Sequence, residues 1–375
     1  MANTLTSLIP DCYAALDVVS RELTGAISAV TRDSRADRVA AGETLRSIVA
    51  PANTAGADIT PAMSLPSAAN QTIGNKTLTI TKNRFFPFSW NGQEQMAMDK
   101  GPGYLTIQQN QIAQAIRAAV NEIEADVCSA AASGISRSFG ATAGVAPLFT
   151  DWAQAKKILD DNGAPQTDRH SIINTTAGVA LRSTANLYKV NEGGEGSLLR
   201  QGVLGNLYGF DIRESAQITA PTVGTGTLYV INGAHSVGAT SVVIKTGSGT
   251  VLAGDIVIIG SHKYTVATGV AAAGTIVINA PGLQAAAADG ASFSIFAASA
   301  KNFALSRNAI VLATRLPEVP VGGDLAIDRA VITDDRTGLS FEIAMYPGFR
   351  MNTYHVSCSW GVACFKPEHI AGIVG

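Results

Sequence analysis

The sequence predicts an α+β protein with a small all-β unit set into its second half. A long stretch around residue 120 has helical periodicity, and several short stretches alternate apolar and polar residues as strands do. A charge-poor segment rich in Gly, Thr and Val follows from residue 221. The length of 375 residues exceeds what one core usually holds, so two or three folded units are expected.

The composition indicates a folded chain whose surface is largely covered by partners. Hydrophobic residues make up 46% of the sequence and charged residues only 15%, too few charges for a disordered chain or for a typical free monomer. Lys and Arg total 27 against 29 Asp and Glu, a net charge of −2. Strong nucleic-acid binding normally requires a basic excess, so the charge balance argues against it.

The chain carries no recognisable targeting segment. Residues 1–25 lack a basic lead-in, and Asp11, Asp17 and Glu22 interrupt their apolar residues, unlike a signal peptide. No apolar run is long enough to cross a bilayer. The four scattered cysteines are therefore expected to be reduced thiols in a cytosol: Cys12, Cys128, Cys358 and Cys364.

Residues 1–45 are expected to form a terminal arm that docks elsewhere. Apolar residues recur there at helical steps or their multiples: Ile9, Tyr13, Leu16, Leu23 and Ile27. A polar stretch with Arg32, Arg35 and Arg38 follows.

Residues 46–100 are expected to form an extended hairpin. The part up to Trp90 lacks helical periodicity, and Leu78 and Ile80 alternate with threonines in the manner of a strand. Two strands joined by a long polar tip have little core of their own, so the hairpin needs a neighbour to lie on.

Residues 101–165 are expected to hold the two main helices. The first runs from about Thr106 to Ala132, with Thr106 and Gln109 as a capping box and one apolar stripe: Ile112, Ile116, Val120, Ile123 and Val127. The second begins with Thr150 as N-cap, buries Trp152, Ala155 and Leu159, and stops at Gly163.

Short strands are expected in 166–216, at about Ser171–Asn174 and Phe210–Ile212. From Pro221 to Ala298 the only charged residues are Lys245, Asp255, Lys263 and Asp289. Residues 217–300 are therefore predicted to be an inserted β-barrel or sandwich with strands at 241–244, 255–259, 263–266 and 275–278. Residues 301–335 return to the host unit, and 336–375 form C-terminal strands.

The search for catalytic or cofactor-binding residues finds none. Gly74–Thr77 lacks the upstream glycine of a P-loop, and Gly134–Ser138 has Ser138 where a nucleophile elbow requires glycine. Gly193, Gly194 and Gly196 are interpreted as a flexible loop. The protein is therefore expected not to be an enzyme and to use no cofactor.

A metal site is not expected either. The best candidate set is His355, Cys358, Cys364 and His369, whose spacing matches no common zinc pattern. The segment from Tyr354 to Trp360 is predicted to be a strand, which would point His355 and Cys358 to opposite faces.

Four stretches in order resemble the major capsid proteins of tailed phages. Gln114–Val127 resembles that family's long spine helix, and Gly202–Ile212 its axial-domain strand and turn. Phe303–Ala313 resembles the strand that re-enters the body, and Gly361–Gly375 the C-terminal end. The β-rich insert is similar to the extra barrel of the short-tailed phage branch.

The resemblance implies a fold with an N-terminal arm, an extended loop, a peripheral domain with the spine helix, an axial domain and the barrel. It implies a shell subunit located in the virion capsid and assembled in the host bacterial cytoplasm as hexamers and pentamers. Scaffolding protein, portal protein and weakly contacted double-stranded DNA are the implied partners, with no membrane.

Some capsids of this fold join a hairpin lysine covalently to an asparagine of a neighbouring chain. Lys76 and Lys82 lie near the hairpin without a clearly placed acid, so no cross-link is expected.

Two other functions fit parts of the sequence. An encapsulin-like nanocompartment shell has the same fold, although the inserted barrel favours a phage. A β-rich surface adhesin or binding module would explain the Thr/Gly/Val-rich insert, but the long amphipathic helix and the lack of an export signal weigh against it.

Overall fold

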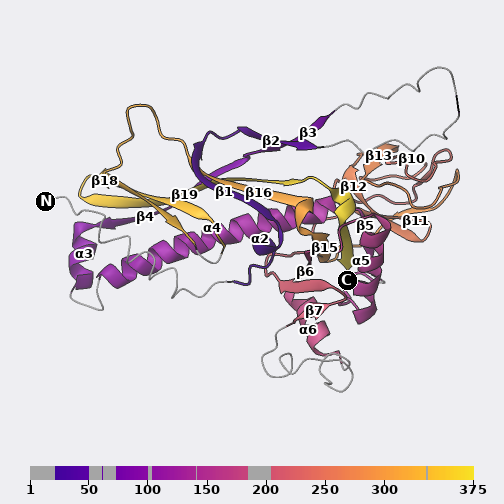
Figure 1. Ribbon diagram of the computed structural model, residues 1–375, viewed down its shortest axis with the longest axis horizontal. Coiled ribbons are helices and arrows are strands. Elements are labelled where there is room, and N and C mark those ends of the chain that lie inside the picture. Colours follow the sequence, from indigo (N-terminus) through magenta and orange to yellow (C-terminus); the bar gives the residue numbers. More distant parts are fainter. Residues whose placement is uncertain are drawn as a thin grey trace.

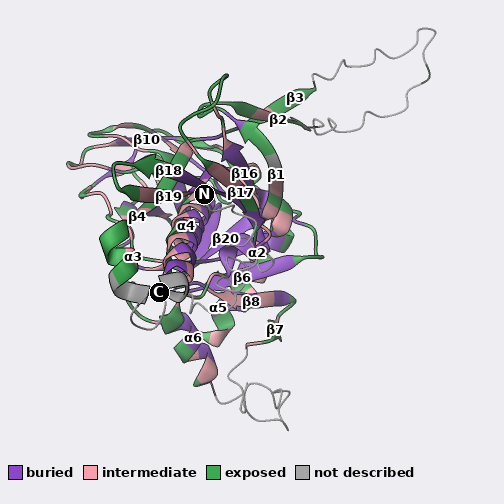
Figure 2. Ribbon diagram, turned by 90° about the vertical axis from the view of Figure 1, so that its left-hand side faces the viewer, coloured by how far each residue is buried: buried purple, intermediate pink, exposed green. Residues whose placement is uncertain are grey.

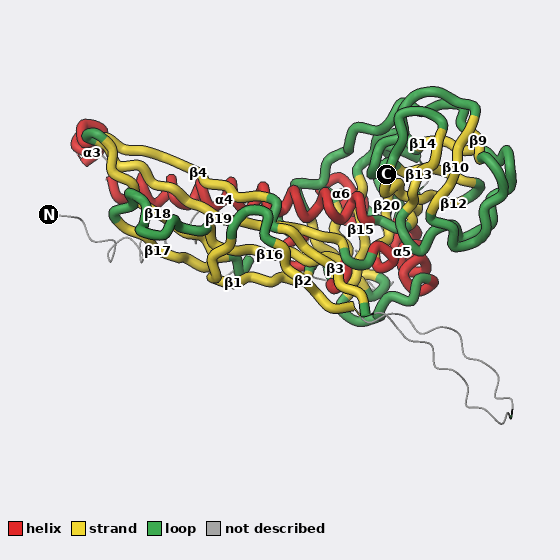
Figure 3. Tube along the Cα trace, turned by 90° about the horizontal axis from the view of Figure 1, so that it is seen from above, coloured by secondary structure: helices red, strands yellow, loops and turns green. Residues whose placement is uncertain are grey.

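The molecule is an elongated body with a rounder β-rich unit at one end (Figures 1 and 3). It is described here from a computed structural model. The structure describes these residues: 22–49, 61, 73–99, 104–140, 142–184, 204–334 and 337–375. The described α-helices all end by Arg182, and the two main sheets are mostly antiparallel, which confirms the α+β class.

One long helix, α4 (Tyr104–Gly134), runs the length of the body, and the shorter α3 (Gly92–Asp99) lies at the end where it begins (Figure 1). Its 31 residues span about 46 Å at 1.5 Å per residue. Ile116 and Val120 are buried, as the apolar stripe predicts. The helix begins before Thr106, so the capping box predicted there is wrong, because apolar spacing locates a helix better than its first residue.

The first sheet lies on this helix. Its strands are β1 (Thr31–Val39), β4 (Lys82–Asn91), β16 (Ile310–Pro317), β17 (Asp328–Thr333), β18 (Ser340–Gly348) and β19 (Met351–Cys364). The long β19 pairs antiparallel with β4, β16 and β18, and β1 pairs parallel with β16. Alternate β19 residues Val356, Cys358 and Trp360 join the core beside α4. The Trp360 indole N–H donates to Asp126 Oδ2 of α4 at 2.7 Å.

The central strands of the body half of the second sheet are buried on both faces. Its strands are β5 (Arg137–Phe139), β6 (Arg169–Ile173), β7 (Asn206–Leu207), β8 (Phe210–Glu214), β15 (Lys301–Ser306) and β20 (Ile370–Val374). Ile172 and Phe303 share the α4 core, whereas Ile173 and Ala304 share a core with α5 (Phe149–Asp161) and α6 (Thr175–Arg182). Two covered faces explain why β6 and β20 are buried along their whole length (Figure 2).

Helix α5 differs from its prediction only at the start. Trp152, Ala155 and Leu159 are buried as expected, and Gly163 ends the helix with a φ of +72°. The N-cap is Leu148 rather than Thr150, because the Asp151 carboxylate accepts the Leu148 N–H at 2.8 Å. The local carboxylate therefore sets the helix start.

Residues 217–300, called the β unit below, contain a ring of paired strands. They are β9 (Val230–Ile231), β10 (Ser241–Lys245), β11 (Ile256–Ile259), β12 (His262–Thr268), β13 (Gly274–Ile278) and β14 (Phe293–Ile295). Antiparallel pairing runs from β9 through β10, β13, β12 and β11 to β14, and a bridge between Val230 and Ser292 closes the ring. The four predicted strands are confirmed. They surround a hydrophobic cluster of their own, which includes Tyr229 and Tyr264.

The β unit is also hydrogen-bonded into the body. Strand β12 pairs antiparallel with β5, placing Lys263 opposite Ser138 and Tyr264 opposite Arg137. One continuous twelve-stranded sheet therefore runs from β7 in the body to β9 in the β unit.

The hairpin is formed by β2 (Thr44–Val49) and β3 (Gly74–Thr79), which pair antiparallel as predicted. Residues 50–60 and 62–72 of its tip lie outside the described residues. After Ile80 the chain turns into β4, which pairs with β19 from Lys82 to Asn91. The later part of the 46–100 segment is thus built into the first sheet.

The described part of the terminal arm docks on the chain's own long helix. The buried Glu124 carboxylate of α4 accepts the N–H groups of Ala26 at 2.7 Å and Ile27 at 2.9 Å, at the start of the short α2 (Ala26–Ala29). Arg117 of α4 pairs with Glu22. The prediction that the arm docks elsewhere is therefore wrong for the residues from Glu22 onward. The residues before it, including the apolar positions from Ile9 to Leu16, lie outside the described part.

Candidate assembly surfaces

The base of the hairpin is fixed to the body. Leu78 and Ile80 are buried in a cluster with Ala313 of β16. The Thr81 N–H donates to the Trp360 carbonyl, and a Cβ on Gly361 would lie only 2.2 Å from the Thr79 carbonyl oxygen. Glycine is required at this crossing. Farther along the hairpin, the β3 positions Gly74, Asn75 and Lys76 are exposed or partly exposed, so the hairpin offers surface to a neighbour.

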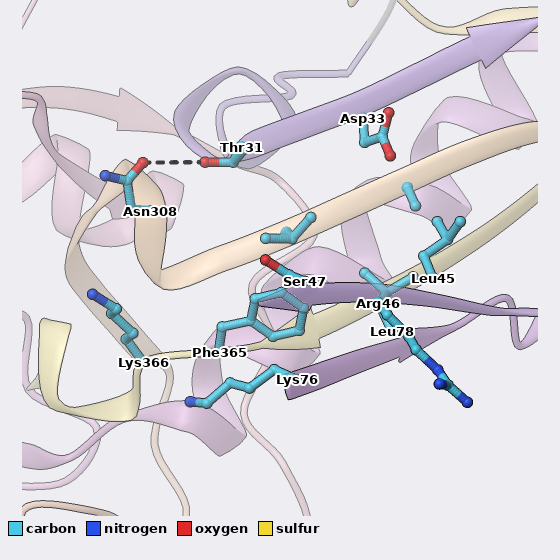
Figure 4. Close-up of a pocket in the computed structure, with 12 residues that line it drawn as sticks. Thr31, Asp33, Leu45, Arg46, Ser47, Lys76, Leu78, Asn308, Phe365 and Lys366 are labelled. Carbon is cyan, nitrogen blue, oxygen red and sulfur yellow. Dashed lines mark hydrogen bonds between the residues drawn. The ribbon is translucent and has the colours of Figure 1, made fainter. Parts of the chain in front are cut away.

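A groove of about 600 Å³ lies under the hairpin, against β1 and β16 (Figure 4). Leu45, Leu78 and Phe365 give it an apolar part. The amines of Lys76 and Lys366 extend to one side of it, past the Phe365 ring (Figure 4). The groove therefore combines an apolar floor with cationic side chains, since Arg46 lines it as well as the two lysines.

Large apolar side chains are also exposed at the end of the body distant from the β unit. Phe349, in the turn between β18 and β19, is 91% exposed. Val321 and Leu325, in the loop between β16 and β17, are 108% and 82% exposed. Exposed apolar side chains that gather in one patch mark an interaction surface. Sequence reasoning missed them, although large apolar residues inside Gly- and Pro-rich turns, as in Pro347–Phe349, are the signal.

The described motifs that were tested for catalytic or cofactor-binding chemistry lie at a helix end and within strands. Gly134 ends α4 and Arg137–Phe139 form β5, while Gly74–Thr77 lie in β3. Gly193, Gly194 and Gly196 lie outside the described residues. No catalytic or cofactor-binding residue was predicted, and none is proposed.

The candidate metal set that the sequence analysis rejected includes two residues that lie on opposite faces of a strand. His355 stacks on Phe85 on one face of β19, whereas Cys358 is buried in the core on the other. Burial raises the pKa of the Cys358 thiol to about 12, and that of Cys128 likewise, so neither is a ready thiolate ligand. Within the described part of the chain, no group of His, Cys, Asp and Glu residues could hold a metal ion.

The aromatic residues of the β unit are used in its core. Tyr229 and Tyr264 are buried, and Phe293 packs edge-on against Tyr229 at 6.2 Å between ring centroids. Sugar and single-stranded nucleic acid are usually held on exposed aromatic faces. The buried rings therefore give no support to the adhesin alternative.

Comparison with known proteins finds similarity of structure without similarity of sequence. No protein-family model matches the chain, and no curated protein matches it. Of the described residues, no helix is both long and apolar enough to cross a membrane.

Solved structures that match the chain over nearly its whole length include two from phages. The capsid structure of the Cyanophage P-SCSP1u matches with a TM-score of 0.53 at 12% identity, covering 95% of this chain and 89% of that one. A structure of Mycobacterium phage Che8 matches with a TM-score of 0.52 at 12% identity, covering 95% and 92%. The long helix, the sheet beneath it, the hairpin and the second sheet are thus those of the tailed-phage major capsid fold, and this chain has that fold.

Proposed function

We propose that the protein is the major capsid protein of a tailed bacteriophage, a structural subunit that builds an icosahedral shell and catalyses no reaction. The observation that carries the proposal is the likeness to the cyanophage capsid over 95% of the chain. The closed ring of strands in the β unit favours the short-tailed branch, whose coat proteins carry an extra barrel.

Copies of this chain are the main partners, arranged as hexamers and pentamers. The β3 positions Gly74, Asn75 and Lys76 of the hairpin are exposed or partly exposed, and Phe349, Val321 and Leu325 present apolar surface. Surfaces of this kind are covered in an assembly. The low charge content of the sequence supports the same arrangement.

Double-stranded DNA packaged through a portal is the proposed content, and a scaffolding protein the proposed assembly partner. A net charge of −2 suits a shell that encloses DNA with weak, non-specific contact. The shell forms in the host bacterial cytoplasm and persists as the virion capsid.

The proposed division follows the capsid fold. The N-terminal arm is 1–45, the extended loop 46–100, the peripheral domain 101–165 and 336–375, the axial domain 166–216 and 301–335, and the inserted barrel 217–300. Strand β20 (Ile370–Val374) contributes to the axial sheet, between β15 and β5, at the end of the last peripheral segment.

Expression of the full chain, alone and with scaffolding protein, tests the proposal. Sedimentation velocity and negative-stain imaging should show closed shells or polymers of repeating capsomers. In the variant Phe349→Ser the assembled fraction should fall while the melting temperature stays within about 1–2 °C of the wild type, because a surface side chain contributes little to folding. A compact monomer under all conditions would rule out the capsid function.

A further inference from the structure

A small cavity lies where the β unit meets the body. Its volume is about 170 Å³, room for roughly five waters at about 30 Å³ each. Strand β5, helix α5 and the turn between β11 and β12 enclose it. Its polar lining consists of Arg137, Ser138, Gln154, Lys157, Ser261, His262 and Lys263.

The lining is positively charged. Among the described residues no acid lines the cavity, and the Asp161 carboxylate beside it lies 2.8 Å from Lys157 Nζ and 3.6 Å from Arg137. Burial, and after it the positive charges of Arg137 and Lys157, lower the pKa of the His262 imidazole. One carboxylate therefore pairs with two permanent cations. Lys263 is engaged elsewhere, since its ammonium donates to the Gly140 carbonyl and lies 4.0 Å above the Phe296 ring.

A buried donor in this lining is unused. The Arg137 side chain is 5% exposed, and its guanidinium donates through one terminal nitrogen to Asn162 Oδ1 at 3.1 Å. Its Nε is buried without a hydrogen-bond partner among the described residues. A buried guanidinium N–H left unpaired is costly, so such groups are normally satisfied.

We propose that this cavity binds a small oxyanion of the phosphate class, held by Arg137, Lys157 and His262. Arginine presents planar paired donors that match phosphate oxygens, and lysine adds a point charge. Gln154 and Ser261 supply further donors at the rim. Because His262 belongs to the β unit and Lys157 to α5, the bound anion ties the β unit to the body beside the pairing of β12 with β5.

Isothermal titration of the full-length protein with inorganic phosphate, at constant ionic strength set with chloride, tests this site. One anion per chain should bind and raise the melting temperature saturably. The variants Lys157→Gln and His262→Gln should each weaken binding about tenfold, the loss expected for one charge-assisted hydrogen bond. Lys156→Gln removes the same charge from the neighbouring position of α5 and should bind as the wild type does.

The source of the phosphate is decided by competition. A short double-stranded DNA that displaces inorganic phosphate would assign the site to nucleic-acid phosphate, whereas a lack of displacement would assign it to the free ion. Absence of phosphate binding to the wild type would overturn the proposal. Equal weakening in Lys156→Gln and Lys157→Gln would also overturn it, because the effect would then be general charge screening.

Discussion

The side-chain amide of Asn279, in the β unit, donates to the Ile135 carbonyl oxygen just past the end of α4 at 2.8 Å. The same amide donates to the Ser133 carbonyl at 2.7 Å. Carbonyls at a helix C-terminus have no partner within the helix. Asn279 therefore caps the long helix from a part of the chain more than 140 residues away.

Replacing Asn279 with alanine should destabilise the subunit by about 1–3 kcal/mol, because it leaves buried carbonyls unsatisfied. Urea unfolding of the unassembled chain would measure the change. Gln284→Ala, at an exposed position of the same unit, should stay within about 0.5 kcal/mol of the wild type. Equal stability of Asn279→Ala and Gln284→Ala would show that the cap contributes nothing.

Ile116 of α4 is fully buried, so Ile116→Asp places an unpaired charge in the main core. The cost is several kcal/mol, comparable to the whole stability of a domain. The variant should be insoluble or protease-sensitive rather than folded and unable to assemble. Asn110→Asp, on the exposed side of the same helix, is the matched control and should remain soluble. Soluble, protease-resistant Ile116→Asp subunits would contradict the assigned packing.

Local patterns in the sequence predicted the elements but not the contacts between them. The apolar stripe located α4, and alternation located the strands of the β unit. The pairing of β12 with β5 was not predictable, because it joins two strand edges far apart in sequence whose side chains carry no matching signal. The docking of Ala26 and Ile27 depends on one carboxylate. Glu124 follows Val120 by four residues and so lies on the buried, apolar face of the helix. An acid at such a position was the signal in the sequence that another segment docks there.

The docked terminal segment should be sensitive to acid. Hydrogen bonds from Arg117 and then Asn121 lower the pKa of Glu22 from 4.5 to about 2. A carboxyl with a lowered pKa in the folded state stabilises it above the ordinary value, and the contribution is lost as the pH falls towards about 2. The contribution of Glu124 to folding stability depends on pH in the opposite direction. Burial raises the pKa of Glu124, so its contribution is lost as the pH rises.

Comparing wild type with Glu22→Gln isolates the first group, because Glu124 is present in both. Their urea midpoints should differ at pH 6 and converge between pH 4.5 and about 2. Glu43→Gln, at an exposed position, should not reproduce this pattern. A constant difference across the whole range would mean that the pair with Arg117 does not form in solution.

Assembled shells should contain no isopeptide cross-link. The Lys82 ammonium lies 3.0 Å from Glu122 and 2.9 Å from Asp126 of its own chain. Burial lowers its pKa, but the hydrogen bonds to Asp126 and Glu122 outweigh this and leave the pKa raised. Amide formation requires a neutral amine, which this setting disfavours, and the Lys76 groove has Asp33 as its only acidic lining residue. Boiled shells should therefore run as single chains on a denaturing gel, and a ladder of multimers would contradict the prediction.

Residues 217–300 should fold when expressed alone. Their main hydrophobic cluster is separate from those of the body, while Ile256 and Phe296 pack with Val374 of β20 in a smaller one. The strand pairing closes on itself through Val230 and Ser292. A unit of this size stabilises itself by only about 3–5 kcal/mol, and isolation removes the β5 edge and the contacts of Asn279. The isolated unit should give a dispersed β-type spectrum and melt cooperatively, at a lower temperature than the same residues in the full chain.

Replacing the β unit with a Gly/Ser linker should uncap α4, expose the edge of β5 and lower the solubility of the coat subunit. A disordered isolated segment, or a deletion that assembles normally, would show that the β unit neither folds independently nor braces the body.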